Sequence, residues 1–575
     1  MSELIQAMCG VLAAWFTCCL LFIGMGLLIS RFMEQRIHQG EDLLLCFWLG
    51  FAFALLFLQL WHLWFPVGRA VFLPLSAMGI AGLFWNRREL LAVWRKNSFQ
   101  KWLFLSVLFL LAIWMSNRAV GSGRLYDTGL YHLNSVHWAK AFPVVPGLGN
   151  LHGRLAFNSS YFLYGALLDT GPVPLKSQHL AAGILLLILM AHTILSGIKL
   201  TARRVPFRSY YLFNILLFTP IVIRVWSRHV SSLSPDLAVF TLGIVISSLL
   251  LALLEKAKSS SRKIEFRIFL IIILSCLGIT IKLSFFVFAL SASLVALFLY
   301  FFQSKRRIAS RNHKVLVSVA VFSAFLLLPW MARGIILSGY CFYPSTIGSF
   351  AVDWRIPKSA VVEEVNWIRS WARMPNVHWS EVLRNWDWLK PWASRMGKNF
   401  EMVCPLALIL AACFLLFYLR LNRKDGQRPS RRNWAFLLPA LTSIFYWFFT
   451  APDIRFVGAS LWVLAAGTVI LLLCRLMGSK KTIGFLLSFL IFFSWLIHEK
   501  ISIQKELFKS KIYPLQRVKL DKFVTHSGLI IYVPKKGDQC WNGPLLSTPF
   551  PKKSLKLRRK GKIRKGFINK DGSIF

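Results

Sequence analysis

The chain has 575 residues, 56% of them hydrophobic, and carries 68 Lys and Arg against 23 Asp and Glu, a formal net charge of +45. Apolar stretches of about 20 residues, the length that crosses a bilayer, recur along most of the chain and exclude an ordinary soluble globular protein. The positive charge falls in short clusters between these stretches, a pattern that encodes membrane orientation and argues against nucleic acid as a partner.

The predicted fold class is an all-α polytopic membrane protein with about fourteen transmembrane helices, located from hydrophobic periodicity and length. The expected spans are residues 8–30, 43–62, 68–86, 101–117, 178–199, 210–226, 236–254, 266–281, 284–303, 315–337, 402–420, 433–450, 456–474 and 482–498. No Lys or Arg precedes Met8 and no clear cleavage site follows, so the first stretch is predicted to be a permanent span rather than a signal peptide.

Basic residues cluster on alternate loops of this prediction, at residues 87–96, 199–208, 256–263, 305–311, 420–432 and 475–481. Under the positive-inside rule these loops face the cytoplasm. They are short and contain no GxxxxGK[ST] sequence, which argues against an ATP-driven pump or a cytoplasmic nucleotide-sugar enzyme. The loops between these clusters and the C-terminal segment, which hold the candidate functional residues, are then expected on the extracytoplasmic side, and the predicted location is a bacterial inner (plasma) membrane.

This orientation divides the chain into six parts. They are N-terminal helices (1–117), an outer loop (118–177), central helices (178–337), a Trp-rich outer loop (338–401), C-terminal helices (402–498) and a small outer domain (499–575).

The first outer loop places an acid directly after a predicted span. Asp127 stands in Tyr126-Asp-Thr-Gly-Leu-Tyr-His132, and Arg154 follows in the same loop. A carboxylate in this position is a candidate general base, and Tyr126, Tyr131, His132 and Arg154 are candidate substrate-binding residues. Residues 130–142 are expected to form a surface helix, with Asp127 and Tyr131 on one face at a spacing of four. A solvated loop with ordinary turns is the alternative.

A second acid, Asp236, follows Ser234 and Pro235, which predict a helix beginning there. The carboxylate either stabilises the positive end of that helix or faces Asp127 across an outer cavity.

Three cations are expected at the same membrane level as these acids. Lys282 lies at a tight turn between two spans, Arg333 lies near the outer end of another, and Arg455 lies in the turn Ala451-Pro-Asp-Ile-Arg-Phe456. They are either snorkelling anchors or cations that bind phosphate or pyrophosphate.

The two remaining outer segments predict local structure. Seven Trp in residues 338–401 are typical of interfacial helices at the headgroup level, although aromatic faces also stack on sugars. The tail has a strand pattern at residues 528–534 and alternation at 555–558, separated by turn signals, which predicts a small β-rich domain. Cys341 and Cys540 both face outward in this topology, so a disulfide between them is an open option. The cysteines show no metal-ligand spacing.

The chain resembles the GT-C superfamily of glycosyltransferases in its many spans, in the acid of the long outer loop, in Asp236 at the next outer turn and in the turn around Arg455. It also resembles a bacterial family of uncharacterised large membrane proteins. That second likeness lies in residues 126–132, in Pro146-Gly-Leu-Gly-Asn-Leu-His-Gly-Arg154, in Leu337-Ser-Gly-Tyr-Cys-Phe-Tyr-Pro344 and in Asp538-Gln-Cys-Trp541.

The GT-C resemblance implies transfer of a sugar from a polyprenyl-phosphate donor to a glycan or lipid acceptor. Asp127 is the matching acid. A single Asp127 followed by Thr128 replaces the usual pair of acids, which leaves dependence on a divalent cation open. The cations at positions 282, 333 and 455 would hold the donor phosphate. The alternative is a transporter or flippase of a lipid-linked glycan, which would place its ionisable groups near the bilayer midplane. A scaffold of an envelope assembly system is a third, unsupported option.

Overall fold

The computed structural model describes residues 2–95, 98–123, 125–171, 175–202, 208–227, 229–255, 261–304, 312–421, 431–476 and 508–569. Ten stretches of described helix are long and apolar enough to cross a membrane. They are formed by α1 (Ser2–Phe32), α2 (Gly40–His62), α5 (Phe99–Ala119), α8 (Ser177–Thr201), α9 (Ser209–Leu216) with α10 (Phe218–Trp226), α11 (Pro235–Leu254), α12 (Ser261–Ile281), α13 (Phe286–Ser304), α14 (Asn312–Ser338) and α18 (Phe400–Leu421). The multi-pass helical architecture is therefore confirmed.

The predicted total of fourteen spans is only partly matched. Three predicted spans correspond to shorter apolar helices, namely α3 (Phe72–Trp85), α19 (Leu438–Thr450) and α20 (Ser460–Leu476). The last predicted span, 482–498, lies outside the described residues. Helices α11 and α12 lie in the middle of the bundle, where their apolar stretches are 89% and 94% buried, as expected for helices that contact protein all round.

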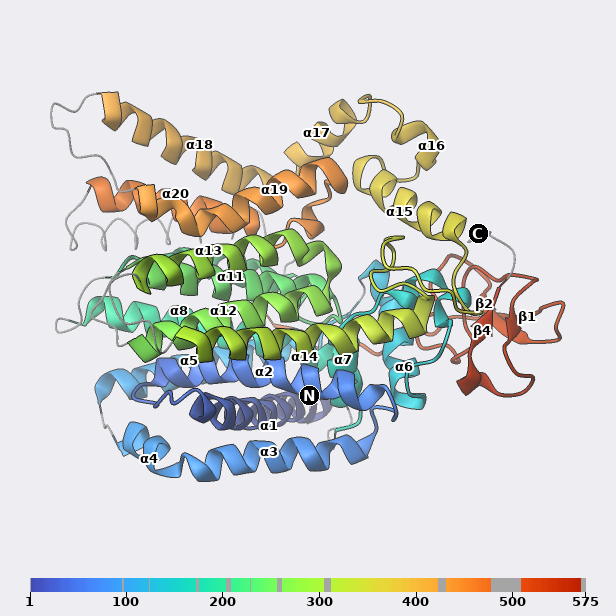
Figure 1. The fold of residues 1–575 in the computed structure, drawn as a ribbon, viewed down its shortest axis with the longest axis horizontal. Helices are drawn as coiled ribbons and strands as arrows, with labels where there is room; N and C mark the ends of the chain where they lie inside the picture. Colours follow the sequence, from blue (N-terminus) through green and yellow to red (C-terminus); the bar gives the residue numbers. More distant parts are fainter. Residues whose placement is uncertain are drawn as a thin grey trace.

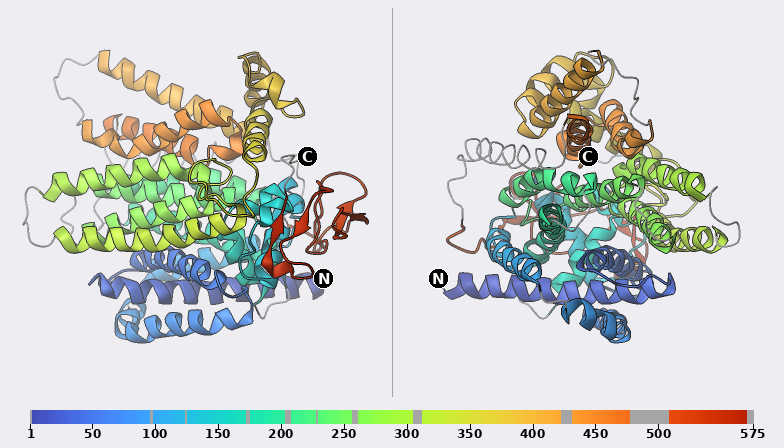
Figure 2. Two further views of the ribbon diagram at one scale, coloured as in Figure 1. Left: turned by 45° about the vertical axis from the view of Figure 1, so that its right-hand side comes forward. Right: turned by 90° about the vertical axis from the view of Figure 1, so that its left-hand side faces the viewer.

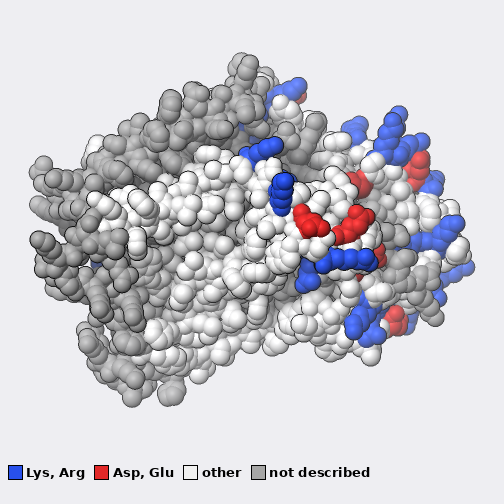
Figure 3. Space-filling model, turned by 90° about the horizontal axis from the view of Figure 1, so that it is seen from above, with Lys and Arg blue, Asp and Glu red and all other residues white. Residues whose placement is uncertain are grey.

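One end of the bundle carries the long loops, and we call it the loop end. It contains the helices α6 (Leu133–Ala141), α7 (Ser160–Asp169), α15 (Lys358–Arg373), α16 (Trp379–Val382) and α17 (Leu389–Gly397). Helix α4 (Arg87–Arg95) lies at the opposite end, as do the described ends of α13 and α14 on either side of the predicted basic loop 305–311 (Figure 1). On the face seen in Figure 3, the described charged side chains gather toward the loop end, and the described helix sides are mainly uncharged.

The C-terminal segment forms two small antiparallel sheets against the loop end. The first pairs β1 (Leu520–Val524) with β2 (Ile530–Pro534), and the second pairs β3 (Lys556–Leu557) with β4 (Phe567–Ile568). Ile531 and Phe567 are fully buried in a core shared with Trp138 of α6. The predicted β structure is confirmed, and Figure 2 shows these strands (red) lying directly against the segment 118–177 (cyan).

Three local predictions need correction. Residues 130–142 are helical, but they begin as a π-helix, Thr128–His132, and continue into α6 with most side chains buried, so this is not a surface helix. The Trp-rich loop forms the expected short helices, yet Trp388 and Trp392 are buried against Trp447 and Phe448. Cys341 and Cys540 are both free thiols, so they do not form a disulfide.

Candidate functional site

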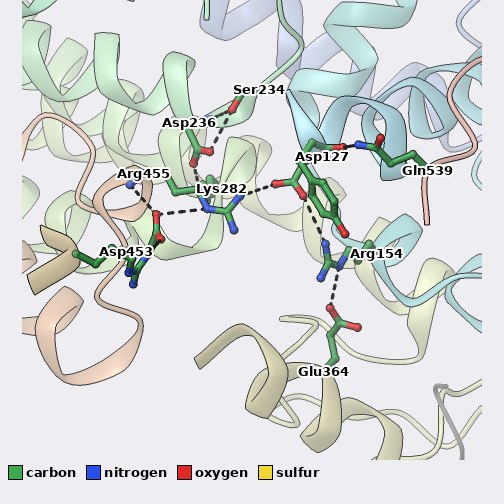
Figure 4. Close-up of polar contacts among 11 residues, drawn as sticks. Asp127, Arg154, Ser234, Asp236, Lys282, Glu364, Asp453, Arg455 and Gln539 are labelled. Carbon is green, nitrogen blue, oxygen red and sulfur yellow. Dashed lines mark hydrogen bonds and ion pairs between the residues drawn. The ribbon is translucent and has the colours of Figure 1, made fainter. Parts of the chain in front are cut away.

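Asp127 is the centre of a chain of alternating charges at the loop end (Figure 4). The Arg455 Nη1 lies 2.9 Å from one carboxylate oxygen of Asp127, and the Arg154 Nη1 lies 3.5 Å from the other. Beyond these cations, Arg154 contacts Glu364 at 3.3 Å and Arg455 contacts Asp453 at 3.6 Å. Asp453 in turn accepts from Arg395 at 3.2 Å. Three acids and three arginines, widely separated in sequence, thus form one continuous network.

Asp127 is placed by the loop end and by the C-terminal segment together. It stands just before the π-helix, whose wide turn bonds the Leu133 N–H to the Thr128 carbonyl. The backbone N–H of Trp541 donates to the Gly129 carbonyl at 2.8 Å, and the Trp541 ring covers Gly129 so closely that a Cβ there would lie 2.5 Å from it. Glycine is required at position 129 because any side chain there would overlap the indole.

Tyr126 completes this attachment instead of facing the ion-pair chain. Its hydroxyl donates to the Asp538 carboxylate, and its carbonyl accepts from the Gln539 amide at 2.7 Å. The motif 126–132 and the motif 538–541 therefore hold one another in place.

Arg455 is held by a short 3-10 turn, Ile454–Phe456, between α19 and α20. Asp453 caps this turn, and its carboxylate accepts the Arg455 backbone N–H at 3.2 Å. The indole N–H of Trp392 donates to the Pro452 carbonyl at 2.5 Å, and that of Trp447 donates to the Asp453 carbonyl at 2.7 Å. The buried tryptophans thus fix the backbone from which Arg455 reaches Asp127.

The second acid pairs with the second predicted cation. Lys282 donates to the Asp236 carboxylate. Asp236 also receives a hydrogen bond from the Ser234 hydroxyl at 3.1 Å, while the Ser234 oxygen accepts the Asp236 N–H at 3.3 Å, so the predicted cap is present. The Lys282 Nζ lies 4.3 Å from the Phe456 ring centre and the Arg455 guanidinium carbon lies 4.9 Å from it. Phe456 therefore joins this pair to the longer chain.

Burial and charge set the protonation states around Asp127. Burial alone would lower the pKa of Arg455, but the carboxylates of Asp127, Asp453 and Asp236 outweigh it and raise the pKa. Burial lowers the pKa of His132 to about 4, against which the acids act only weakly, so this imidazole is neutral above pH 5. Burial raises the pKa of Tyr131 well above its ordinary value, assisted by Asp127.

The site lies within a long part of the chain that matches a known family model. A family model described as a domain of unknown function, DUF8201, matches residues 8–462. The chain belongs to this family. No curated protein and no solved structure matches it. The DUF8201 region contains every member of the ion-pair chain and the Asp236–Lys282 pair, whereas Trp541 and its motif lie beyond it.

Most of the predicted site residues of this DUF8201 member converge, and two do not. Arg154 and Arg455 each contact Asp127 directly, and the Asp236–Lys282 pair lies beside Arg455 against Phe456. Tyr131 and His132 pack behind Asp127, with ring centres 4.5 Å apart. Tyr126 turns to the C-terminal segment. Arg333 lies in a separate cavity with His62 and Trp138.

Three members of the network are absent from the predicted site, namely Glu364, Arg395 and Asp453. Glu364 is only 3% exposed, on the same face of α15 as the buried Ala360 and Val361, at spacings of four and three residues. An acid on the apolar face of an amphipathic helix indicates a buried ion pair, and this pattern could have identified Glu364 from the sequence. Among the described residues, no group of three or more His, Cys, Asp or Glu is arranged to hold a metal ion.

Proposed function

We propose that the chain is a GT-C-like glycosyltransferase that moves a sugar from a polyprenyl-phosphate donor to a hydroxyl of a cell-envelope acceptor. The observation that carries the proposal is the contact between Asp127 and Arg455, which joins the candidate base to the candidate phosphate-binding cation. A base and a leaving-group cation must lie within one substrate's reach for such a displacement.

The exposure of these groups supports a substrate site rather than a structural ion pair. The side chains of Asp127 and Arg455 are 18% and 34% exposed, and that of Lys282 is 21% exposed. The Glu364 carboxylate, at the far end of the network, is by contrast only 4% exposed. A phosphate that displaced the carboxylate from Arg455 would meet both Arg455 and Lys282, whose charged groups lie 4.9 and 4.3 Å from the centre of the same Phe456 ring.

In the proposed reaction, the donor phosphate competes with Asp127 for Arg455. The released carboxylate then accepts the proton of the acceptor hydroxyl. The hydroxyl oxygen forms a bond to the anomeric carbon on the face opposite the phosphate, and the carbon–oxygen bond to the phosphate breaks. The electron pair leaves with polyprenyl phosphate, whose additional charge is stabilised by Arg455 and Lys282.

The proposal includes an orientation. The loop end faces away from the cytoplasm, the helices form about fourteen spans of a bacterial inner membrane, and the lipid-linked donor reaches Asp127 from the outer leaflet. The basic segments at the opposite end, including Arg87 and Arg88 of α4, support this sidedness.

The deciding experiment compares Asp127→Asn with Asp521→Asn in a deletion strain. Asp127→Asn is expected to abolish transfer while expression and membrane insertion stay normal. Asp521 on β1 is a matched control, because it is an acid outside the network that is 61% exposed and forms an ion pair with Lys535. The Asp521→Asn variant should restore the glycan. Normal surface glycan in the Asp127→Asn strain would eliminate the proposal.

The same strains distinguish the flippase alternative. Loss of a transferase leaves a lipid-linked or surface glycan that lacks one sugar. Loss of a flippase leaves the complete lipid-linked glycan on the cytoplasmic leaflet. Asp236 lies in the first turn of α11, Lys282 follows the end of α12 and Arg455 lies in the turn between α19 and α20, so these groups are at helix ends. A flippase would be expected to place such groups near the bilayer midplane, so this placement favours the transferase.

A further inference from the structure

A second polar cluster lines a cavity between α2, α6, α14 and the segment before α7. Its polar lining includes His62, Ser135, Trp138, Asn158 and Arg333, and the rest is mainly apolar. The cavity volume is about 30 Å³. About 10–15 Å³ on this scale holds one water molecule, so there is room for roughly two water-sized species. No residue of the Asp127 network lines this space.

Arg333 brings an uncompensated charge to the cavity. It is 4% exposed, and its Nε and Nη1 have no hydrogen-bond partner. No described carboxylate forms an ion pair with it. A guanidinium cannot lose its charge in a protein, and a buried charge without a counter-charge is strongly unfavourable. The cavity therefore requires a negative partner for Arg333.

The neighbouring groups add further hydrogen-bond donors that have no partner. The indole N–H of Trp138 and the hydroxyl of Ser135 are buried without partners. The Asn158 Oδ1 is also unpartnered, while its amide nitrogen already donates to the Trp330 carbonyl at 2.5 Å. Indole and guanidinium groups donate only. An anion only accepts, and the unpartnered donors on Arg333, Trp138 and Ser135 outnumber the unpartnered acceptor Asn158 Oδ1, so this lining fits an anion.

We propose that the cavity is a binding site for a small inorganic anion of halide type, held by Arg333, Trp138 and Ser135. The volume is too small for a sugar or a phosphate-bearing headgroup, so this site is distinct from the proposed donor site. The ion would neutralise α14 where it packs against α2 and α6, joining the membrane helices to the loop end. The inference does not depend on the proposed function.

The test measures thermal unfolding of the purified full-length protein in sodium chloride and in sodium gluconate at equal ionic strength. The unfolding temperature is expected to rise with chloride concentration and not with gluconate, because a ligand that binds only the folded state stabilises it. Bromide is expected to raise the unfolding temperature as chloride does. Arg333→Leu should abolish the chloride-dependent rise while unfolding in gluconate at or above the wild-type temperature. Arg31→Leu, a half-exposed arginine on α1, should keep the wild-type response.

Trp138→Phe provides a second variant that keeps the aromatic packing and removes one donor. The chloride concentration needed for half of the effect should rise about tenfold, since hydrogen bonds to charged groups are among the stronger ones. The inference is overturned if wild-type protein responds equally to chloride and gluconate, or if Arg333→Leu or Trp138→Phe responds to chloride as the wild type does. Water would then fill the cavity.

Discussion

The contact between Gly129 and Trp541 offers a direct test of how the C-terminal segment holds the Asp127 loop. A Cβ on Gly129 would lie 2.5, 2.7 and 2.8 Å from three atoms of the indole. The indole cannot yield easily, because Trp541 is 4% exposed and its backbone is bonded to Gly129. Its φ of 46° is in the left-handed region, which is unfavourable for Trp. Gly129→Ala should therefore displace the motif 538–541.

The expected cost of this overpacking is about 1–3 kcal/mol. If only the attachment of the C-terminal segment is weakened, its detached population rises about 5- to 150-fold. Limited trypsinolysis reports this population, since cleavage follows the open form when opening is fast. The basic segment 552–565 supplies the cleavage sites. The initial rate of cleavage there should rise in proportion.

Two further variants make the reasoning refutable. Gly197→Ala on α8 adds a Cβ with nothing within 4 Å and should leave the cleavage rate unchanged. Trp541→Gly removes the ring and suits the positive φ, so adding Gly129→Ala to it should cause no additional cleavage. Wild-type cleavage of Gly129→Ala, or an undiminished effect in the Trp541→Gly background, would refute the role assigned to the indole.

Three other predictions concern the same region. Glu364→Gln should destabilise the protein by about 1–3 kcal/mol, because it removes a buried carboxylate that accepts from Arg154; a denaturation midpoint unchanged from the wild type would contradict this. Burial lowers the pKa of His132 from 6.5 to about 4, so the unfolded chain binds the proton more readily. Stability should fall as pH drops from 6.5 towards 4, and less so in His132→Phe. Reducing agent should leave trypsinolysis unchanged, since Cys341 and Cys540 are free.

The helices at the membrane and their order were predictable because long apolar stretches report bilayer length directly. Ser234 and Pro235 likewise predicted the beginning of α11, since capping depends on neighbours in sequence. The π-helix at Thr128–His132 was not predictable, because it depends on Trp541, more than 400 residues away, whose backbone bonds the Gly129 carbonyl. The sequence around Thr128–His132 does not indicate a partner so distant along the chain.

The candidate site was predictable only in part, because its residues also come from distant parts of the chain. Asp127 and Arg455 could be proposed as partners because both were assigned to the same end of predicted helices. Arg333 met the same criterion, yet its side chain points into a different cavity. The position of a residue along its helix predicts its depth in the membrane. It does not predict which cavity the side chain enters, because that depends on how α2, α6 and α14 pack.

The charge balance of the network explains why a base can be surrounded by arginines in the proposed reaction. Without donor, the chain from Glu364 to Arg395 contains three acids and three cations, and Asp236 with Lys282 adds one of each, so these described pairs are neutral. A phosphodiester donor adds one negative charge. When the carbon–oxygen bond breaks, the leaving phosphate carries one more negative charge, and Asp127 loses its own by accepting the acceptor's proton. The summed charge stays constant through the step, so Arg455 can pass from the carboxylate to the phosphate without any change in the net charge of the site.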